Sequence, residues 1–139
     1  MAQGVIVIAE YWNNSFRKIS LEAVCEARRL ATELGENVIA VVMGSGVTDA
    51  AAELGKYGAD RIYVADDSAL ADFQGEAYAN VLSEIMAEVD PKIAIFGSTS
   101  TGIELSARIA AKKGVGLANE CTELKLEDGS LIATRPVYG

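Results

Sequence analysis

The chain has 139 residues, of which 50% are apolar and 23% are charged, a composition typical of one globular domain with a substantial core. Its formal net charge of −8 argues against nucleic acid and anionic lipid as partners, because an acidic surface repels polyanions. The chain has no histidine, so we expect no metal site and no ordinary hydrolase chemistry.

The sequence shows no pattern typical of a membrane-spanning segment or a signal peptide. No apolar run approaches the roughly 20 residues that span a bilayer, and the N-terminus lacks the basic start of a signal peptide. Cys25 and Cys121 are far apart and have no C-x-x-C partner. We therefore expect no membrane association and two reduced cysteines in a cytosolic protein.

Buried strands and amphipathic helices alternate along most of the chain. Short apolar, β-branched runs predict strands at 5–9, 38–43, 61–65 and 93–96. The segment 10–18 is polar and irregular. Helical spacing predicts helices at about 21–34, with Ser20 as N-cap, and at about 48–57, 76–89 and 101–113. This alternation predicts an α/β fold: a Rossmann-like, three-layer αβα arrangement around a mainly parallel sheet.

The pattern changes near the C-terminus. After Gly114–Gly116, polar and apolar residues alternate on both sides of Asp128-Gly129. Because Asp-Gly between alternating runs is a strong hairpin signal, we predict an antiparallel hairpin over Glu120–Val137. No linker interrupts the chain, and we expect residues 1–139 to form a single domain.

The loop "FGSTSTGIE" at 96–104 joins a predicted strand to a predicted helix, the geometry that cradles phosphates. It matches the first half of a Walker A motif, but Ile103 and Glu104 replace the required Lys and Ser or Thr, so the chain is no P-loop NTPase. No G-x-G-x-x-G dinucleotide motif is present either. Two readings of the loop remain, a weak phosphate cradle or a helix N-cap that only turns the chain. The loop residues concerned are Gly97, Ser98, Thr99, Ser100, Thr101 and Gly102.

Charge argues against a phosphate in this loop. Glu104 is predicted in the first helical turn, where a carboxylate already complements the helix dipole and repels a second anion. No Lys or Arg lies inside the loop, and Arg108 is about one turn further on. We therefore interpret the loop as keeping the geometry of a nucleotide site without its charge.

The ends of the strands suggest where a ligand or a partner would bind. Ligands of parallel sheets bind beyond the carboxyl ends of the strands, where the strand order reverses. If the first and fourth strands are neighbours, the loops 10–14 and 97–102 face each other there. Tyr11 and Trp12 in the first loop form either a lid over the sheet or a contact with a partner or cofactor. A receiver-like phosphoacceptor built from Glu10, Asp66 or Asp67, and Thr99 lacks the acid pair expected after the first strand.

Several segments are characteristic of a known family. The segments "VIVIAE", "VVMGSGV", "AAELGKYGADRIYVADD", "IAIFGSTSTGIELSARIAAKKGVGLANECTEL" and "IATRPVYG" resemble, in order and across essentially the whole chain, the electron transfer flavoprotein alpha subunit. The resemblance implies the adenine-nucleotide alpha-hydrolase-like fold with strand order 3-2-1-4-5. It also implies an N-terminal scaffold domain whose nucleotide site is empty. Many family members have arginine after Gly102, where this chain has Ile103.

The resemblance also implies a function and a set of partners. The family's heterodimer carries electrons from dehydrogenases to an acceptor, and the alpha subunit continues into a second domain that holds FAD. The sequence here ends at Gly139, so we expect a fragment without the FAD domain, not itself an enzyme, with FAD bound only in the full heterodimer. We expect a beta-subunit interface at Tyr11, Trp12 and Arg135, or self-association without that partner. The expected location is the cytoplasm, or else the mitochondrial matrix.

An alternative function uses the same fold. A stress-type module would bind AMP or ATP directly at residues 97–102. Nucleotide binding by this loop distinguishes the two hypotheses.

Overall fold

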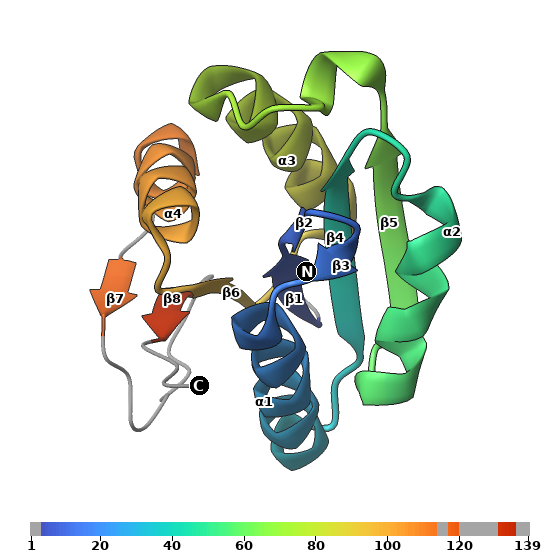
Figure 1. Ribbon diagram of the computed structural model, residues 1–139. Coiled ribbons are helices and arrows are strands. Elements are labelled where there is room, and N and C mark those ends of the chain that lie inside the picture. The colour runs from blue at the N-terminus through green and yellow to red at the C-terminus, as the bar shows by residue number, and fades with distance from the viewer. Residues whose placement is uncertain (1–3, 114–116, 120–130, 136–139) are drawn as a thin grey trace.

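The computed structural model describes residues 4–113, 117–119 and 131–135 (Figure 1). Within these ranges one sheet has the strand order β5-β4-β1-β6-β8-β7, and all of its neighbouring strands are parallel. Its strands are β1 (Val5–Ala9), β4 (Val38–Gly44), β5 (Arg61–Asp66), β6 (Ile93–Gly97), β7 (Leu117–Asn119) and β8 (Leu131–Arg135).

The order of the first four predicted strands is confirmed. β5, β4, β1 and β6 lie side by side as 3-2-1-4, and β8 continues the sheet beyond β6. The chain therefore reverses its direction of travel across the sheet at β1, with β4 on one side and β6 on the other. The carboxyl ends of β1 and β6 form the switch point, the position at which such sheets bind ligands.

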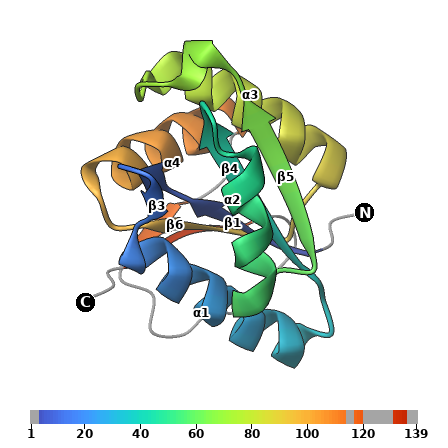
Figure 2. The same cartoon turned by 45° about the vertical axis from the view of Figure 1, so that its right-hand side comes forward.

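Helices cover both faces of the sheet. Figure 2 shows α3 and α4 on one face, and α1 with α2 on the other. The helical elements are α1 (Lys18–Leu34), α2 (Thr48–Ala51), the 3₁₀ turns η1 (Ala52–Tyr57) and η2 (Ser68–Leu70), α3 (Gly75–Val89) and α4 (Ser100–Lys113). The predicted three-layer α/β architecture is thus confirmed.

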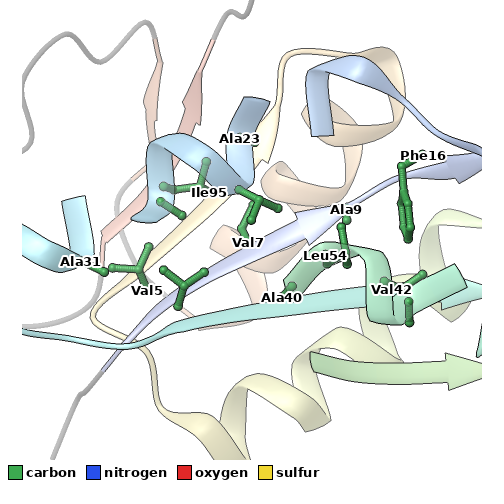
Figure 3. Packing of buried hydrophobic residues seen from close by; sticks show 14 of the residues in the cluster. Val5, Val7, Ala9, Phe16, Ala23, Ala31, Ala40, Val42, Leu54 and Ile95 are labelled. Carbon is green, nitrogen blue, oxygen red and sulfur yellow. The ribbon is translucent and has the colours of Figure 1, made fainter. Parts of the chain in front are cut away.

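Burial on both faces explains why β1 is apolar at every position. Val5, Val7 and Ala9 pack toward α1 and η1 (Figure 3). Ile6 and Ile8 point to the opposite face and pack with α3 and α4. All five side chains are at most 4% exposed, so neither face of this strand tolerates a polar residue without a partner.

The segment after β1 is more regular than the sequence analysis indicated. β2 (Tyr11–Trp12) and β3 (Ser15–Phe16) form a small antiparallel hairpin. Its two turn residues, Asn13 and Asn14, have φ of 54° and 65°. Asparagine tolerates this left-handed conformation, and two such residues in succession suit the tight turns that match strand twist.

The start of the first helix also differs from its prediction. α1 begins at Lys18 with Arg17 as its N-cap residue, and no side chain caps it. Ser20 is instead buried inside the helix, and its Oγ accepts a hydrogen bond from the Glu10 backbone N–H at 2.7 Å. The serine therefore ties α1 to the end of β1, a long-range role that local helix signals do not reveal.

The antiparallel hairpin predicted for 120–137 is wrong for the part of it that the structure describes. β8 is hydrogen-bonded to β6 on one side and to β7 on the other, and both pairings are parallel. Among the described residues, the neighbours of β8 on both sides therefore run parallel to it. The turn at Asp128-Gly129 lies outside the described residues. Alternating polarity reports that a strand has two unlike faces, but it does not set the direction of the neighbouring strand.

Candidate functional site

Glu10 is the residue at which the two loops of the switch point meet. It follows β1 directly, and its Oε2 accepts a hydrogen bond from the Thr99 hydroxyl at 2.8 Å. Its backbone carbonyl accepts the Arg17 N–H at 2.9 Å, and its own N–H is donated to Ser20. One residue therefore connects β1, the start of α1 and the loop before α4. The sequence prediction that residues 10–14 face residues 97–102 is confirmed.

The Glu10 carboxylate is largely withdrawn from water. Its side chain is 11% exposed, and Arg17 Nε lies 3.7 Å from Oε1. Burial raises the pKa of Glu10 and outweighs the opposing effects of the Thr99 hydrogen bond and the Arg17 charge. The Glu10 carboxylate has thus lost hydrating water, and the Thr99 hydrogen bond and the Arg17 charge make up for that loss only in part.

The loop at 97–102 is folded tightly upon itself. The Thr99 hydroxyl accepts the Gly102 N–H at 2.9 Å, and the Thr99 carbonyl accepts the Ile103 N–H at 2.8 Å. A Cβ on Gly102 would lie 2.0 Å from the Gly97 carbonyl oxygen. Gly102 is therefore required by the packing of one backbone segment on another, whether or not a ligand binds.

Glu104 does not have the position that the sequence analysis predicted. α4 begins at Ser100, and its first turn holds no acidic residue. Glu104 pairs with Arg108 at 3.1 Å, beside Gly75 at the start of α3. The carboxylate at the loop is Glu10 instead. It precedes Thr99 by 89 positions in the chain, so no local pattern could assign it.

The two aromatic residues after β1 have different surroundings. The Tyr11 ring packs edge-on against Phe16 at 5.1 Å. Trp12 is 66% exposed, and the Arg17 guanidinium lies 5.4 Å from the centre of its ring. Arg135, the third residue predicted at an interface, ends β8 opposite Gly97. Its backbone therefore lies beside the loop, which brings this strand end and the loop together at one end of the sheet.

A small cleft opens at the carboxyl end of β1. It has a volume of about 100 Å³. Its walls come from β1, the β2–β3 hairpin, β4, α3, α4 and the segment before α3, and they include Ile8, Glu10, Trp12, Met43, Tyr78 and Thr101. The lining is mostly apolar and aromatic, with Glu10 and Arg17 as its charged groups.

The aspartates considered for a receiver-like phosphoacceptor are used to cap short helices. Asp66 accepts the backbone N–H groups of Gly46, Val47 and Thr48 as well as the Thr48 hydroxyl. These bonds, chiefly that of the Thr48 hydroxyl, lower the pKa of Asp66. Asp67 caps η2 by accepting the Ala69 N–H at 2.8 Å. Both carboxylates therefore have structural partners.

Two further features bear on the class of protein. In the part of the chain that the structure describes, no group of three His, Cys, Asp or Glu residues is arranged to hold a metal ion. Among the same residues, no helix combines the length and the hydropathy needed to cross a bilayer.

Comparison with known proteins points to one family. The family model of the electron transfer flavoprotein domain matches residues 5–139. The electron transfer flavoprotein subunit alpha of Thermoanaerobacterium thermosaccharolyticum is 37% identical, over 96% of this chain and 41% of that protein. The subunit alpha of Bacillus subtilis is 33% identical, over 99% of this chain and 42% of its own length. The chain thus spans about two fifths of these relatives.

Other matches include a dehydrogenase subunit and a solved structure. A lactate dehydrogenase (NAD(+),ferredoxin) subunit of Acetobacterium woodii is 35% identical, over 99% of this chain and 33% of that protein. A universal stress protein solved in complex with cAMP has a TM-score of 0.55 at 16% identity, covering 97% of this chain and 98% of its own. At that identity the structural likeness shows a shared fold only.

Proposed function

Because the chain belongs to the electron transfer flavoprotein domain family, we propose that residues 1–139 are the N-terminal domain of an alpha subunit. Its role is structural, namely to pack against a beta subunit and to support the domain that holds the flavin. The observation that carries this proposal is the ordered match over residues 5–139 to alpha subunits. In this proposal the domain has no catalytic activity of its own and serves a carrier that passes electrons from dehydrogenases to an acceptor.

The family implies a flavin in the full-length protein. The cleft at the end of β1 measures about 100 Å³, and a wider cleft of about 530 Å³ lies beside it, lined in part by Trp12, Arg17 and Thr99. A diphosphate in the smaller cleft would meet the buried Glu10 carboxylate, which lines that cleft. We propose that the FAD of the heterodimer binds to the part of the alpha subunit that this chain does not cover, since the chain spans about two fifths of its relatives.

The surface around Trp12 is the beta-subunit interface in this proposal. An exposed indole next to an arginine is typical of the residues that dominate binding energy at interfaces. Trp12 is 66% exposed, while Tyr11 packs on Phe16 and stiffens the hairpin that presents it. Arg135 ends the strand next to the loop 97–102 and belongs to the same end of the sheet.

Co-expression with the beta subunit of the same organism tests the proposal. We expect a stable one-to-one complex by size-exclusion chromatography with light scattering. Trp12→Ala should weaken the complex about tenfold or more, since a buried aromatic anchor contributes roughly 2 kcal/mol or more to binding. Val64→Ala is the matched control, because Val64 is also exposed but lies on β5 at one edge of the sheet. Absence of a complex would refute the proposed function.

Self-association is the second outcome to measure. If the chain without its partner forms dimers through the same surface, Trp12→Ala should convert them to monomers while Val64→Ala does not. A wild-type chain that stays monomeric across the accessible concentrations would refute self-association without affecting the proposed heterodimer.

A further inference from the structure

The position of Glu10 decides what can approach the switch point. Its Oε2 lies at the loop 97–102 and accepts a hydrogen bond from the Thr99 hydroxyl at 2.8 Å. A Cβ placed on Gly97 would lie 3.4 Å from the same oxygen. The carboxylate therefore occupies the space between the end of β1 and the loop that leads into α4.

The contacts of Glu10 hold it in that place. Its backbone N–H and carbonyl are both bonded to the start of α1, through Ser20 and Arg17. Because both backbone groups are engaged and the side chain is 11% exposed, the carboxylate cannot swing into solvent without breaking buried contacts.

Arg17 and Arg108, two arginines near this end of the sheet, are both paired with carboxylates. Arg17 lies 3.7 Å from Glu10 and stacks on Trp12, so its charge is already shared with an anion and a ring. Arg108 is engaged by Glu104 at 3.1 Å. Among the side chains that the structure describes, an incoming phosphate would therefore meet a partly desolvated carboxylate and arginines that are already paired with anions.

We propose that the Glu10 carboxylate determines which ligands can bind at this end of the sheet. It keeps phosphate-bearing nucleotides away from the loop 97–102. This inference deepens the proposed function, on which it rests, because it assigns a role to the buried carboxylate at the loop of the scaffold domain. Glu10, and not the sequence-predicted Glu104, is the group that excludes the second anion.

Calorimetric titration with AMP and with inorganic phosphate tests the proposal on three proteins. These are the wild-type chain, Glu10→Gln and the matched control Glu104→Gln, which removes the same charge from a carboxylate near the same helix. Glutamine keeps an oxygen that can accept the Thr99 hydroxyl. We expect Glu10→Gln to bind AMP about tenfold or more tightly than the wild type, since one nearby charge accounts for roughly that factor. Glu104→Gln also releases Arg108 from its ion pair, so any gain in AMP binding should be smaller than that of Glu10→Gln.

Three results would overturn the proposal: equal AMP binding by the wild type and Glu10→Gln, no binding by either, or an equal gain in Glu104→Gln. Adenosine serves as a probe without phosphate, and its affinity should be the same for wild type and Glu10→Gln. Glu10→Ser is a second neutral variant if the glutamine variant folds poorly, with circular dichroism as the check. Each protein is also mixed with the beta subunit. Complex formation without any gain in AMP binding would refute this inference and leave the proposed function intact.

Discussion

Replacement of Gly102 by alanine would test whether the loop 97–102 is shaped by its own packing. The added Cβ would lie 2.0 Å from the Gly97 carbonyl oxygen and 3.0 Å from the Gly97 carbonyl carbon. Ordinary contacts of a Cβ begin at 3.4 Å. Both neighbours are backbone atoms, and Gly97 is paired in the sheet opposite Arg135. To relieve this overlap, the start of α4 or the end of β6 would have to move by more than about 1 Å, which is roughly the size of the overlap.

The expected cost follows from two opposing effects. Overpacking a well-packed site costs about 1–3 kcal/mol, and a backbone–backbone overlap belongs near the upper end of that range. Against this, alanine in place of glycine in the first turns of α4 stabilises the helix by about 1 kcal/mol, because alanine has the higher helix propensity. The net loss is about 2 kcal/mol, which lowers the melting temperature of a domain of this size by roughly 5–10 °C.

Thermal unfolding followed by circular dichroism measures the effect, with Gly55→Ala as the control. Gly55 lies in η1, and a Cβ there would meet nothing within 4 Å. We expect Gly55→Ala to melt at the wild-type temperature or slightly above it. If Gly102→Ala is as stable as Gly55→Ala, the close approach of Gly97 and Gly102 is not a constraint, and the packing explanation for this glycine is wrong.

Three other predictions concern buried and charged side chains. Phe96→Ala should lower the free energy of unfolding in urea by about 3–5 kcal/mol, because Phe96 is fully buried with α3 and α4. Burial raises the pKa of Glu10, so this group stabilises the fold below its ordinary value of 4.5, and that contribution is lost as the pH rises through the folded pKa. Glu10→Gln should therefore melt above the wild type at pH 7 and lose this advantage near pH 4, as thermal scans across pH would show. The pKa of Asp66 is lowered, so its contribution is present above the ordinary value of 3.8 and is lost as the pH falls through the folded pKa. Asp66→Asn should melt below the wild type at pH 7, and the difference should narrow in acid; equal melting temperatures at pH 7 would contradict the capping role.

The sequence by itself determined the elements and the class of the fold. The apolar runs of β1, β4 and β6 are local signals, since a strand buried on both faces must be apolar throughout. Helical spacing located α1, α3 and α4 to within a few residues. The resemblance to the family supplied the strand order, which the parallel pairings of β1 with β4 and β6 confirm.

Only the tertiary structure decided how the site is built. From the sequence, Glu104 is the expected source of anion repulsion, because that residue is close to the loop along the chain. The structure instead places Glu10 at the loop, hydrogen-bonded to Thr99, and pairs Glu104 with Arg108. The direction of β8 escaped prediction for a similar reason, since polarity alternates along a strand whichever way its neighbours run. Both features are contacts between segments far apart in the chain, and they exist only once the sheet has brought those segments together.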